Sequence, residues 1–310
     1  MMDVIKTRIP DTREEWLALR MNGIGGSDAG AVLGFNQYKS PYTLWCEKTG
    51  RLSLYAPDSE AMRVGRDLED YVARRWMEDT GKKVRKSGFS FQSKEHPFML
   101  ANVDRLVVGE NAGLECKTAN ALTRTRYDRG DIPASYYAQC MHYMAVTGLE
   151  RWYIAVLVMG KGFYTYTVER DEKEIEELIS AEESFWSSVT NGVEPEIDGS
   201  QSTSDTLAAL YPESGGETED LPELDDAAVM LDDISSRMKE LEKMKKQYEN
   251  RIKDTMKDLE KCDTGSAVIT WKSFQSGRID TKKLREEMPD IYEKYVKVSS
   301  SRRFTLKMKK

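Results

Sequence analysis

Helical spacing of apolar residues marks several segments of the chain. Thr12 and Glu15 have the spacing of a capping box, which predicts that a helix starts there and runs to Arg20. After the glycine-rich stretch NGIGG, Ser27 is a favourable N-cap residue and predicts that a second helix begins at this point. Longer helices are predicted where apolar positions recur every three or four residues, over Glu60–Asp79, Ala134–Thr147 and Asp171–Val189.

Short runs of β-branched and aromatic residues, bounded by glycine and polar residues, predict five strands. Two of them flank a Gly-Glu-Asn-Ala-Gly turn and form a β-hairpin. The strands are Phe89–Gln92, Val103–Val108, Leu114–Cys116, Trp152–Met159 and Phe163–Val168. The order of helices, three strands, a helix, two strands and a helix predicts an α/β fold, more closely an α+β mixed sheet flanked by helices.

The chain is predicted to have three parts. Residues 1–192 carry the elements above and form one domain. Residues 193–226 hold eleven acidic residues and no Lys or Arg, together with Ser, Thr, Gly and Pro, and predict a flexible linker. Residues 227–310 are predicted to form a helical hairpin or short coiled coil and a small basic strand–helix–strand tail. Apolar positions of that helix are Leu231, Ile234, Met238, Leu241, Tyr248, Ile252 and Leu259.

Composition limits the chemistry of the site. The 310-residue chain has four widely separated cysteines and two histidines, which argues against a disulfide framework or a zinc site. Any bound metal is then a hard cation with oxygen ligands. The net charge of −7 reflects the acidic segment, whereas residues 261–310 hold thirteen basic and six acidic residues. No apolar run is long enough to cross a bilayer, so we expect a soluble, cytoplasmic protein without a membrane partner.

Charged residues interrupt the predicted hairpin where apolar residues are expected. Glu115 and Lys117 share one face of their strand, with Cys116 on the other face, and Asp104 lies on the partner strand. Two converging carboxylates repel each other unless a divalent cation lies between them, and the Cys116 carbonyl can add an oxygen ligand. An ammonium beside such an ion suits phosphodiester cleavage. From these residues alone, a cross-strand ion pair on an exposed hairpin remains an alternative.

Two helices carry further candidates. Glu69 lies in MRVGRDLEDYVARRW, before the strands, and Gln139 opens a Q-x-x-x-Y pattern in YYAQCMHYMAVTG. This pattern resembles a motif of the RecB-like nucleases. Four charged residues follow one another in the order Glu69, Asp104, Glu115 and Lys117. This order resembles the motif of the PD-(D/E)xK nuclease superfamily.

The stretch RMNGIGGSDAGAVLG resembles the start of the YqaJ-like viral recombinase family, to which bacteriophage lambda exonuclease is related. The resemblance covers Thr7–Gly192. In that family an Arg and a Ser hold the terminal 5′-phosphate of DNA, and by position these are Arg20 and Ser27. A glycine turn that opens a helix also presents free N–H groups to an anion. A simple capped turn remains an alternative for these residues.

The resemblance implies a PD-(D/E)xK fold and hydrolysis of DNA with Mg²⁺ or Mn²⁺ as cofactor. Glu69 would bind a second ion or hold one through water. Lys117 would position the attacking water or stabilise the transition state, and Gln139 would organise that region. The implied metal ligands are Asp104, Glu115, the Cys116 carbonyl and Glu69.

The resemblance also implies a 5′→3′ exonuclease of phage or prophage origin that acts on double-stranded DNA ends with a 5′-phosphate. The 3′ overhangs it leaves would feed a single-strand annealing recombinase protein, the expected partner. The basic C-terminal segment would bind nucleic acid or a partner, or form a homo-oligomer as a dimerisation module. Alternatives are an endonuclease of the same fold and a non-catalytic scaffold that binds DNA ends. Candidate DNA contacts after the hairpin are Arg124, Arg126 and Arg129.

Overall fold

The structure of the chain, a computed structural model, describes residues 4–10, 12–53, 59–298 and 301–308. The chain divides into two compact units, Met1–Leu210 and Tyr211–Lys310. None of the helices formed by the described residues has the length and apolar content that a bilayer crossing requires.

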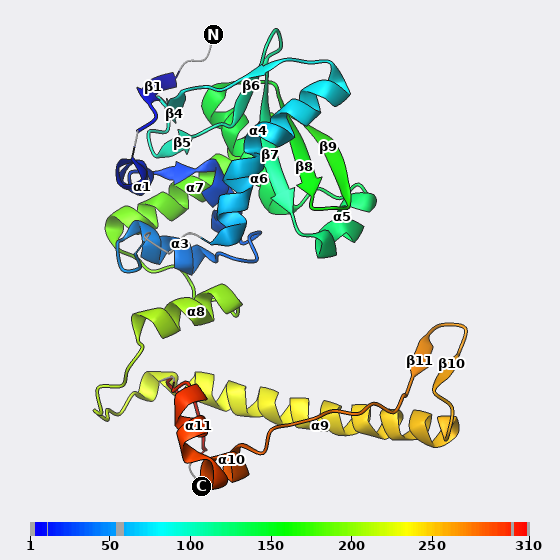
Figure 1. Cartoon of the computed structure of the whole chain (residues 1–310). Helices are drawn as coiled ribbons and strands as arrows, with labels where there is room; N and C mark the ends of the chain where they lie inside the picture. Colours follow the sequence, from blue (N-terminus) through cyan, green and yellow to red (C-terminus); the bar gives the residue numbers. More distant parts are fainter. Residues whose placement is uncertain (1–3, 11, 54–58, 299–300, 309–310) are drawn as a thin grey trace. The chain divides into compact units, whose positions relative to one another are not determined.

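A five-stranded mixed sheet forms the centre of the first unit (Figure 1). Its strands lie in the order β3-β6-β7-β8-β9, with β7 and β8 parallel and the other neighbours antiparallel. The parallel pair requires a long connection, and α6 lies within it. The strands are β3 (Val84–Arg85), β6 (Arg105–Val107), β7 (Ala112–Ala119), β8 (Arg151–Val158) and β9 (Gly162–Glu169).

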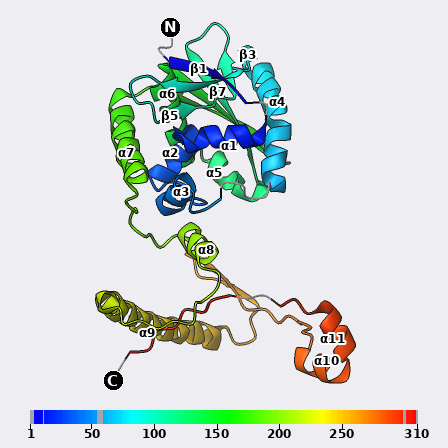
Figure 2. The ribbon, with the colours of Figure 1, turned by 90° about the vertical axis from the view of Figure 1, so that its left-hand side faces the viewer.

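Helices cover both faces of this sheet. On one face, Trp76 of α4 is buried with Leu114 of β7 and Ala155 of β8. On the other face, Met144 of α6 is buried with Ile154 of β8, and α7 packs on α6. Figure 2 shows α4 and α7 on opposite sides of this unit. These helices are α4 (Glu60–Thr80), α6 (Ala134–Thr147) and α7 (Glu172–Asn191).

A four-stranded sheet in the order β1-β4-β5-β2 and three short helices complete the core of the unit. At the contact between α2 and α6, a Cβ on Gly26 would lie 2.4 Å from the Tyr143 ring and one on Gly30 2.8 Å from Ser135. Only glycine allows this close approach, which fixes α6 against the N-terminal segment. These elements are β1 (Val4–Arg8), α1 (Arg13–Met21), β2 (Ile24–Gly25), α2 (Gly26–Val32), α3 (Pro41–Lys48), β4 (Phe89–Ser93) and β5 (Met99–Ala101).

The predicted mixed sheet flanked by helices is confirmed, and α6 has the predicted bounds. Thr12 caps α1 as predicted, because its hydroxyl accepts the Glu15 N–H at 3.2 Å. The prediction that Ser27 is an N-cap is wrong, because α2 already begins at Gly26. The Asp28 carboxylate accepts the Gly25 N–H at 3.2 Å instead, so a carboxylate inside the first turn replaces the expected hydroxyl.

The first unit extends to Leu210, whereas the sequence predicted a domain end at residue 192 and a linker over 193–226. Helix α8 (Gln201–Leu210) lies inside that segment and packs on α3. The Thr203 hydroxyl donates to Ser40 Oγ at 2.8 Å, and Thr206 Oγ1 lies 2.8 Å from Thr43 Oγ1. This contact combines buried hydroxyl groups with two leucines, Leu207 and Leu210, which pack on the cluster around Trp45. Two apolar positions are too short a pattern to predict a helix.

The second unit contains α9, a single helix of 32 residues, at the place of the predicted helical hairpin or short coiled coil. An antiparallel strand pair, β10 and β11, follows it. The predicted closing basic strand is wrong for residues 301–308, which have no regular structure. The elements are η2 (Pro222–Leu224), α9 (Asp225–Met256), β10 (Lys261–Asp263), β11 (Val268–Thr270), α10 (Thr281–Glu287) and α11 (Pro289–Tyr295).

A fully buried ion pair joins α6 to α7. His142 Nδ1 lies 2.8 Å from Glu182 Oε1, and His142 Nε2 lies 2.9 Å from the carbonyl oxygen of Leu100 in β5. The Glu182 carboxylate and the Leu100 carbonyl are both hydrogen-bond acceptors. The His142–Glu182 pair therefore holds one proton more than a neutral imidazole and an ionised carboxylate would hold together. Burial alone would lower the pKa of His142, but the Glu182 carboxylate more than offsets this and the pKa is raised.

We expect this pair to make stability depend on pH in the neutral to alkaline range. A raised folded-state pKa of His142 adds stability that is complete below the unfolded-state pKa of about 6.5 and is lost as pH rises through the folded-state value. Glu182→Gln should lower the free energy of unfolding by about 3 kcal/mol near neutral pH and flatten this dependence. Chemical denaturation across pH measures both, with Glu183→Gln, an exposed neighbour, as control. Equal pH profiles for parent and Glu182→Gln would contradict the assignment.

Candidate active site

The pairing of β6 with β7 brings the two hairpin carboxylates together. Arg105 pairs with Leu114, and continuing this antiparallel register by one residue places Asp104 across from Glu115. Asp104 Oδ2 accepts the backbone N–H of Cys116 at 2.8 Å. Because the N–H and C=O of one strand residue lie at the same strand edge, the Cys116 carbonyl lies at the edge that Asp104 occupies.

Glu115, Lys117 and Gln139 form a closed triangle of polar contacts between β7 and α6. Glu115 Oε1 lies 2.7 Å from Lys117 Nζ and accepts from Gln139 Nε2 at 2.7 Å. Lys117 Nζ donates to Gln139 Oε1 at 2.9 Å. Gln139 Nε2 also lies 2.8 Å from the Tyr143 hydroxyl, which donates to the Asn102 carbonyl at 2.9 Å. The predicted residues of β7 and α6 therefore meet, together with Tyr143 of the Q-x-x-x-Y pattern, and the Asn102 carbonyl adds a contact that the sequence prediction did not include.

The cluster is strongly acidic. Burial raises the pKa of Asp104 well above its ordinary value, and the nearby charges of Glu115 and Glu69 raise it further. Burial alone would lower the pKa of Lys117, but Glu115 and Asp104 more than offset this and raise it. Glu115 is 4% exposed, and none of the described residues donates a hydrogen bond to its second oxygen, Oε2. A buried carboxylate oxygen without a donor is energetically costly, and it is available as a ligand for a cation.

Glu69 is held by an arginine that the sequence prediction did not include. Arg105, buried in β6, donates to Glu69 Oε1 at 2.5 Å and to the Asp104 carbonyl at 2.6 Å, and also forms an ion pair with Asp70 of α4. The hairpin prediction gave Arg105 no role. Within the described residues, no three His, Cys, Asp or Glu side chains converge closely enough to form a ready-made metal cage.

The donors at this site suit a hard divalent cation. Asp104 and Glu115 supply carboxylate oxygens, and the Cys116 carbonyl lies at the same strand edge. Burial raises the pKa of the Cys116 thiol, so this group stays protonated and offers no thiolate to a soft metal. Two carboxylates and a carbonyl would leave other ligand positions to water, as is usual for Mg²⁺.

A second cluster joins α1, α2 and α3. Arg20 Nη2 donates to Ser27 Oγ at 3.2 Å and to Asp28 Oδ1 at 2.6 Å, so the two residues predicted to hold a phosphate meet. Lys48, buried in α3, donates to Asp28 Oδ2 at 2.9 Å and to the carbonyls of Arg20 and Gly23 at 2.7 Å each. Burial alone would raise the pKa of Asp28, but Arg20 and Lys48 together hold it lower.

Asp28 and Lys48 were missed because neither stands out in the sequence. Asp28 lies beside the predicted Ser27 and has the position of a capping carboxylate in the first turn of α2. Lys48 lies in α3, which the strand and helix patterns did not predict. Ser27 is exposed and the Arg20 side chain is 20% exposed, so both can be reached from solvent.

The predicted DNA-contacting arginines lie directly after β7. A short 3₁₀ turn, η1 (Ala121–Thr123), leads into α5 (Arg124–Asp128), which the buried Tyr127 anchors. Arg126 and Arg129 are exposed, and the side chain of Arg124 lies outside the described residues.

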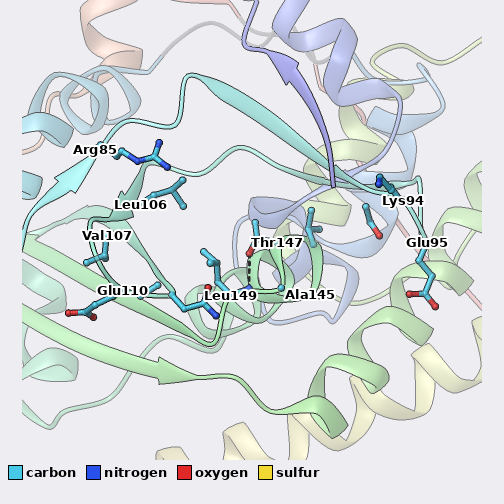
Figure 3. A pocket seen from close by; sticks show the side chains of 14 residues that line it. Arg85, Lys94, Glu95, Leu106, Val107, Glu110, Ala145, Thr147 and Leu149 are labelled. Atoms are coloured by element: carbon cyan, nitrogen blue, oxygen red, sulfur yellow. Dashed lines mark hydrogen bonds between the residues drawn. The ribbon is translucent and has the colours of Figure 1, made fainter. Parts of the chain in front are cut away.

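A separate cavity of about 600 Å³ lies away from both clusters. Figure 3 shows its lining, which includes Arg85, Glu110 and Thr147 and none of the predicted site residues. The Thr147 hydroxyl already donates to the Tyr143 carbonyl at 2.6 Å. Among the described residues, the buried side-chain atoms that lack a partner belong to Asn102, Glu115 and Trp152, and none of these lines the cavity.

In fold, the chain belongs to a class that includes solved exonucleases. It is similar to the crystal structure of an alkaline exonuclease from Laribacter hongkongensis, with a TM-score of 0.51 and 22% identity over 64% of this chain and 100% of that chain. The crystal structure of the same exonuclease in complex with dAMP gives a TM-score of 0.52, with the same identity and coverage. These similarities confirm the nuclease-type fold.

The YqaJ-like viral recombinase domain matches residues 15–150. The chain is also 41% identical over 305 residues to the uncharacterized protein YqaJ of Bacillus subtilis (strain 168), which covers 96% of this chain and 94% of that protein. The chain belongs to the YqaJ-like viral recombinase family, as the RMNGIGGSDAGAVLG stretch and the hairpin motif indicated.

We expect Asp28 to be needed for the stability of the Arg20–Lys48 cluster. Asp28→Asn leaves the Lys48 ammonium buried without its counter-charge, which should lower the free energy of unfolding by about 3–5 kcal/mol. Since the pKa of Asp28 is lowered, this contribution is present above the unfolded-state pKa of about 3.9 and is lost as pH falls through the folded-state value. Denaturant titration measures the loss, with the exposed Asp67→Asn as control. A stability equal to the parent would contradict the ion-pair assignment.

Proposed function

We propose that the chain is a DNA exonuclease that requires Mg²⁺ or Mn²⁺ and digests linear double-stranded DNA in the 5′→3′ direction from 5′-phosphate ends. The observation that carries this proposal is the buried cluster of Asp104, Glu115, Lys117 and Gln139, with one Glu115 oxygen lacking a donor. A structural ion pair would satisfy both carboxylate oxygens. An acidic cluster with an unsatisfied oxygen and an adjacent ammonium suits hydrolysis of a phosphodiester.

Each residue has a role that its contacts support. Asp104 and Glu115, with the Cys116 carbonyl, would hold the cation, which when bound would polarise the phosphate and activate water. Lys117 keeps its proton, because its pKa is raised, and so offers a fixed positive charge to the phosphate as negative charge develops on it. Gln139 holds Lys117 and Glu115 in one geometry.

Glu69 would act from α4 at a distance. Its Oε1 accepts from Arg105, which also contacts the Asp104 carbonyl. In this arrangement Glu69 adds negative charge near Asp104 and would bind the cation through water or hold a second ion.

Recognition of the DNA end would fall to the Arg20 cluster. Arg20 and Lys48 bring two positive charges and Asp28 one negative charge, so the cluster keeps a net charge of one positive unit beside the exposed Ser27 hydroxyl. A phosphate is attracted to such a site, and a guanidinium is the side chain that matches it best. Arg126 and Arg129 after β7 would hold the backbone of the duplex.

The fold comparison agrees with this proposal, because the similar crystal structures are of an alkaline exonuclease, in one case in complex with dAMP. Digestion with this polarity leaves 3′ single strands. We propose that these pass to a single-strand annealing recombinase protein in the cytoplasm of the bacterial host, where a phage or prophage would encode the chain.

We expect Glu115→Gln and Lys117→Met each to reduce digestion of linear duplex by roughly 10²–10³-fold, because each removes one charge from the cluster. Release of acid-soluble nucleotides with Mg²⁺ measures the rate. Glu110→Gln is a matched control, because Glu110 lies in the turn of the same hairpin and pairs with Lys82 and Tyr153. Thermal unfolding checks that each variant is folded. Digestion at the parent rate by folded Glu115→Gln would refute the assigned site.

Arg20→Gln should reduce the preference for 5′-phosphate over 5′-hydroxyl ends, whereas Glu115→Gln should slow both substrates and leave their ratio unchanged. The reason is that Arg20 would contact the end phosphate and Glu115 the scissile one. Duplexes labelled at the 5′ or the 3′ end report both the ratio and the polarity. Loss of label from 3′ ends first, or cutting of covalently closed circles, would contradict the proposed polarity or the need for an end.

A further inference from the structure

Helix α9 carries a largely apolar stripe that faces solvent, with Lys245 inside it. Met238 is 59% exposed, Leu241 64% and Tyr248 58%. Single exposed apolar residues are common, but a stripe along one face of a long helix marks a contact surface. The exposed apolar residues along this helix are Val229, Met230, Leu231, Ile234, Met238, Leu241, Met244, Tyr248 and Ile252.

The stripe follows a heptad repeat. Eight positions step alternately by three and four residues, which is the spacing that turns one face toward a partner helix in a left-handed coiled coil. The a positions are Leu231, Met238, Lys245 and Ile252, and the d positions are Ile234, Leu241, Tyr248 and Thr255. The repeat therefore continues through more than three heptads, the length that favours a coiled coil over a surface helix.

The heptad repeat ends near Met256, where the strand pair β10–β11 packs beside the end of α9. Met256 is 3% exposed. Cys262 and Ile269 of the following strand pair line a shallow hollow with Met256 and with one side of the stripe residues Tyr248, Ile252 and Thr255. The helix ends there, and Lys257 has a positive φ of 47°. All eight stripe positions from Leu231 to Thr255 are nevertheless exposed among the described residues, so this face is open to a partner.

Charges beside the stripe select a direction of pairing. In a parallel, in-register pair, a g residue faces the e residue of the next heptad, so Arg237 of each helix faces Glu242 of the other. In the antiparallel alignment that pairs all eight stripe positions, Arg237 would face Arg251 and Glu242 would face Glu242 of the other helix. Like charges oppose that alignment, and opposite charges favour the parallel one.

We propose that α9 pairs in parallel with α9 of a second copy of this chain, as a two-stranded coiled coil over Leu231–Thr255. Lys245 at an a position fits two strands, because a polar residue there fixes register and restricts the number of helices. In two strands its ammonium can reach solvent and its neighbour Glu249, which lies 3.8 Å away within the helix. The pairing involves only the second unit and does not depend on the proposed nuclease activity.

The first test is the mass of the full-length chain by sedimentation equilibrium. We expect a dimer that weakens on the order of 100-fold in Leu241→Glu, because a carboxylate replaces a central d residue. Asn250→Glu places the same carboxylate at an f position on the opposite side of the helix and should remain dimeric. Helical circular dichroism checks that both variants keep α9. A monomeric parent, a trimer or larger assembly, or a Leu241→Glu dimer as tight as the parent would each overturn the proposal.

The second test reads the direction of pairing from charge. Arg237→Glu should weaken the dimer about tenfold, because the new carboxylate of each helix then faces Glu242 of the other helix. Adding Glu242→Arg should restore the dimer. Arg237 also pairs with Asp233 of its own helix at 2.9 Å, but only an interhelical contact predicts rescue by Glu242→Arg. An antiparallel pair predicts the opposite, since Arg237→Glu would then face Arg251 and tighten the dimer, and that result would overturn the parallel arrangement.

The third test fixes the register by disulfide formation. In a Cys262→Ser background, Lys245→Cys should form a disulfide-linked dimer on oxidation, because equivalent a positions face each other in a parallel, in-register pair. Asn250→Cys, on the outer side of the helix, should not. Equal linkage at the two positions, or none at residue 245, would contradict the register. Non-reducing electrophoresis reads the result without any nuclease assay.

Discussion

The pairing register of β6 with β7 is the constraint on which the candidate active site depends. It places Asp104 across from Glu115 and lets Asp104 Oδ2 accept the Cys116 N–H. Because side chains alternate between the faces of a strand, a slip of one residue would turn Glu115 and Lys117 toward α4 and away from Gln139. The register is fixed from both faces: Leu114 packs with Trp76 of α4, and the ring of Trp152 lies so close to Gly113 that a Cβ there would be 2.3 Å from it.

The second constraint is the close contact of α2 with α6, which links the two polar clusters. Asp28 of α2 holds Arg20 and Lys48, while Gln139 and Tyr143 of α6 hold the hairpin residues. Gly26 lies against the Tyr143 ring without room for a Cβ. The site proposed to bind the DNA end and the site proposed to cut it are therefore held at a fixed separation by backbone packing. An exonuclease that measures from an end needs such a fixed separation.

Local signals allowed much of this to be predicted. Apolar periodicity gave α4, α6 and α7, the capping hydroxyl of Thr12 gave the start of α1, and the turn residues gave the hairpin. The convergence of Glu115, Lys117 and Gln139 could be expected from their motifs. Arg105, Asp28 and Lys48 could not, because their roles come from residues distant in sequence: Arg105 lies 36 residues from its partner Glu69, and Lys48 lies in a helix without a periodic signal. Helix α8 was not predicted because hydroxyl contacts with α3 and only two leucines hold it.

Arg105 explains how so many carboxylates can gather beside one another. Glu69, Asp70, Asp104 and Glu115 would repel one another if all were free, and burial would make the repulsion worse. Arg105 and Lys86 together balance Glu69 and Asp70 on the α4 face of the sheet, while Lys117 pairs with Glu115 on the α6 face. Among the described residues, the Cys116 N–H and the charge of Lys117 favour the ionised form of Asp104, but burial and the charges of Glu115 and Glu69 outweigh them and raise its pKa. The two carboxylates of Asp104 and Glu115 therefore share less positive charge than they carry negative charge. The divalent cation proposed above would supply the difference at this place.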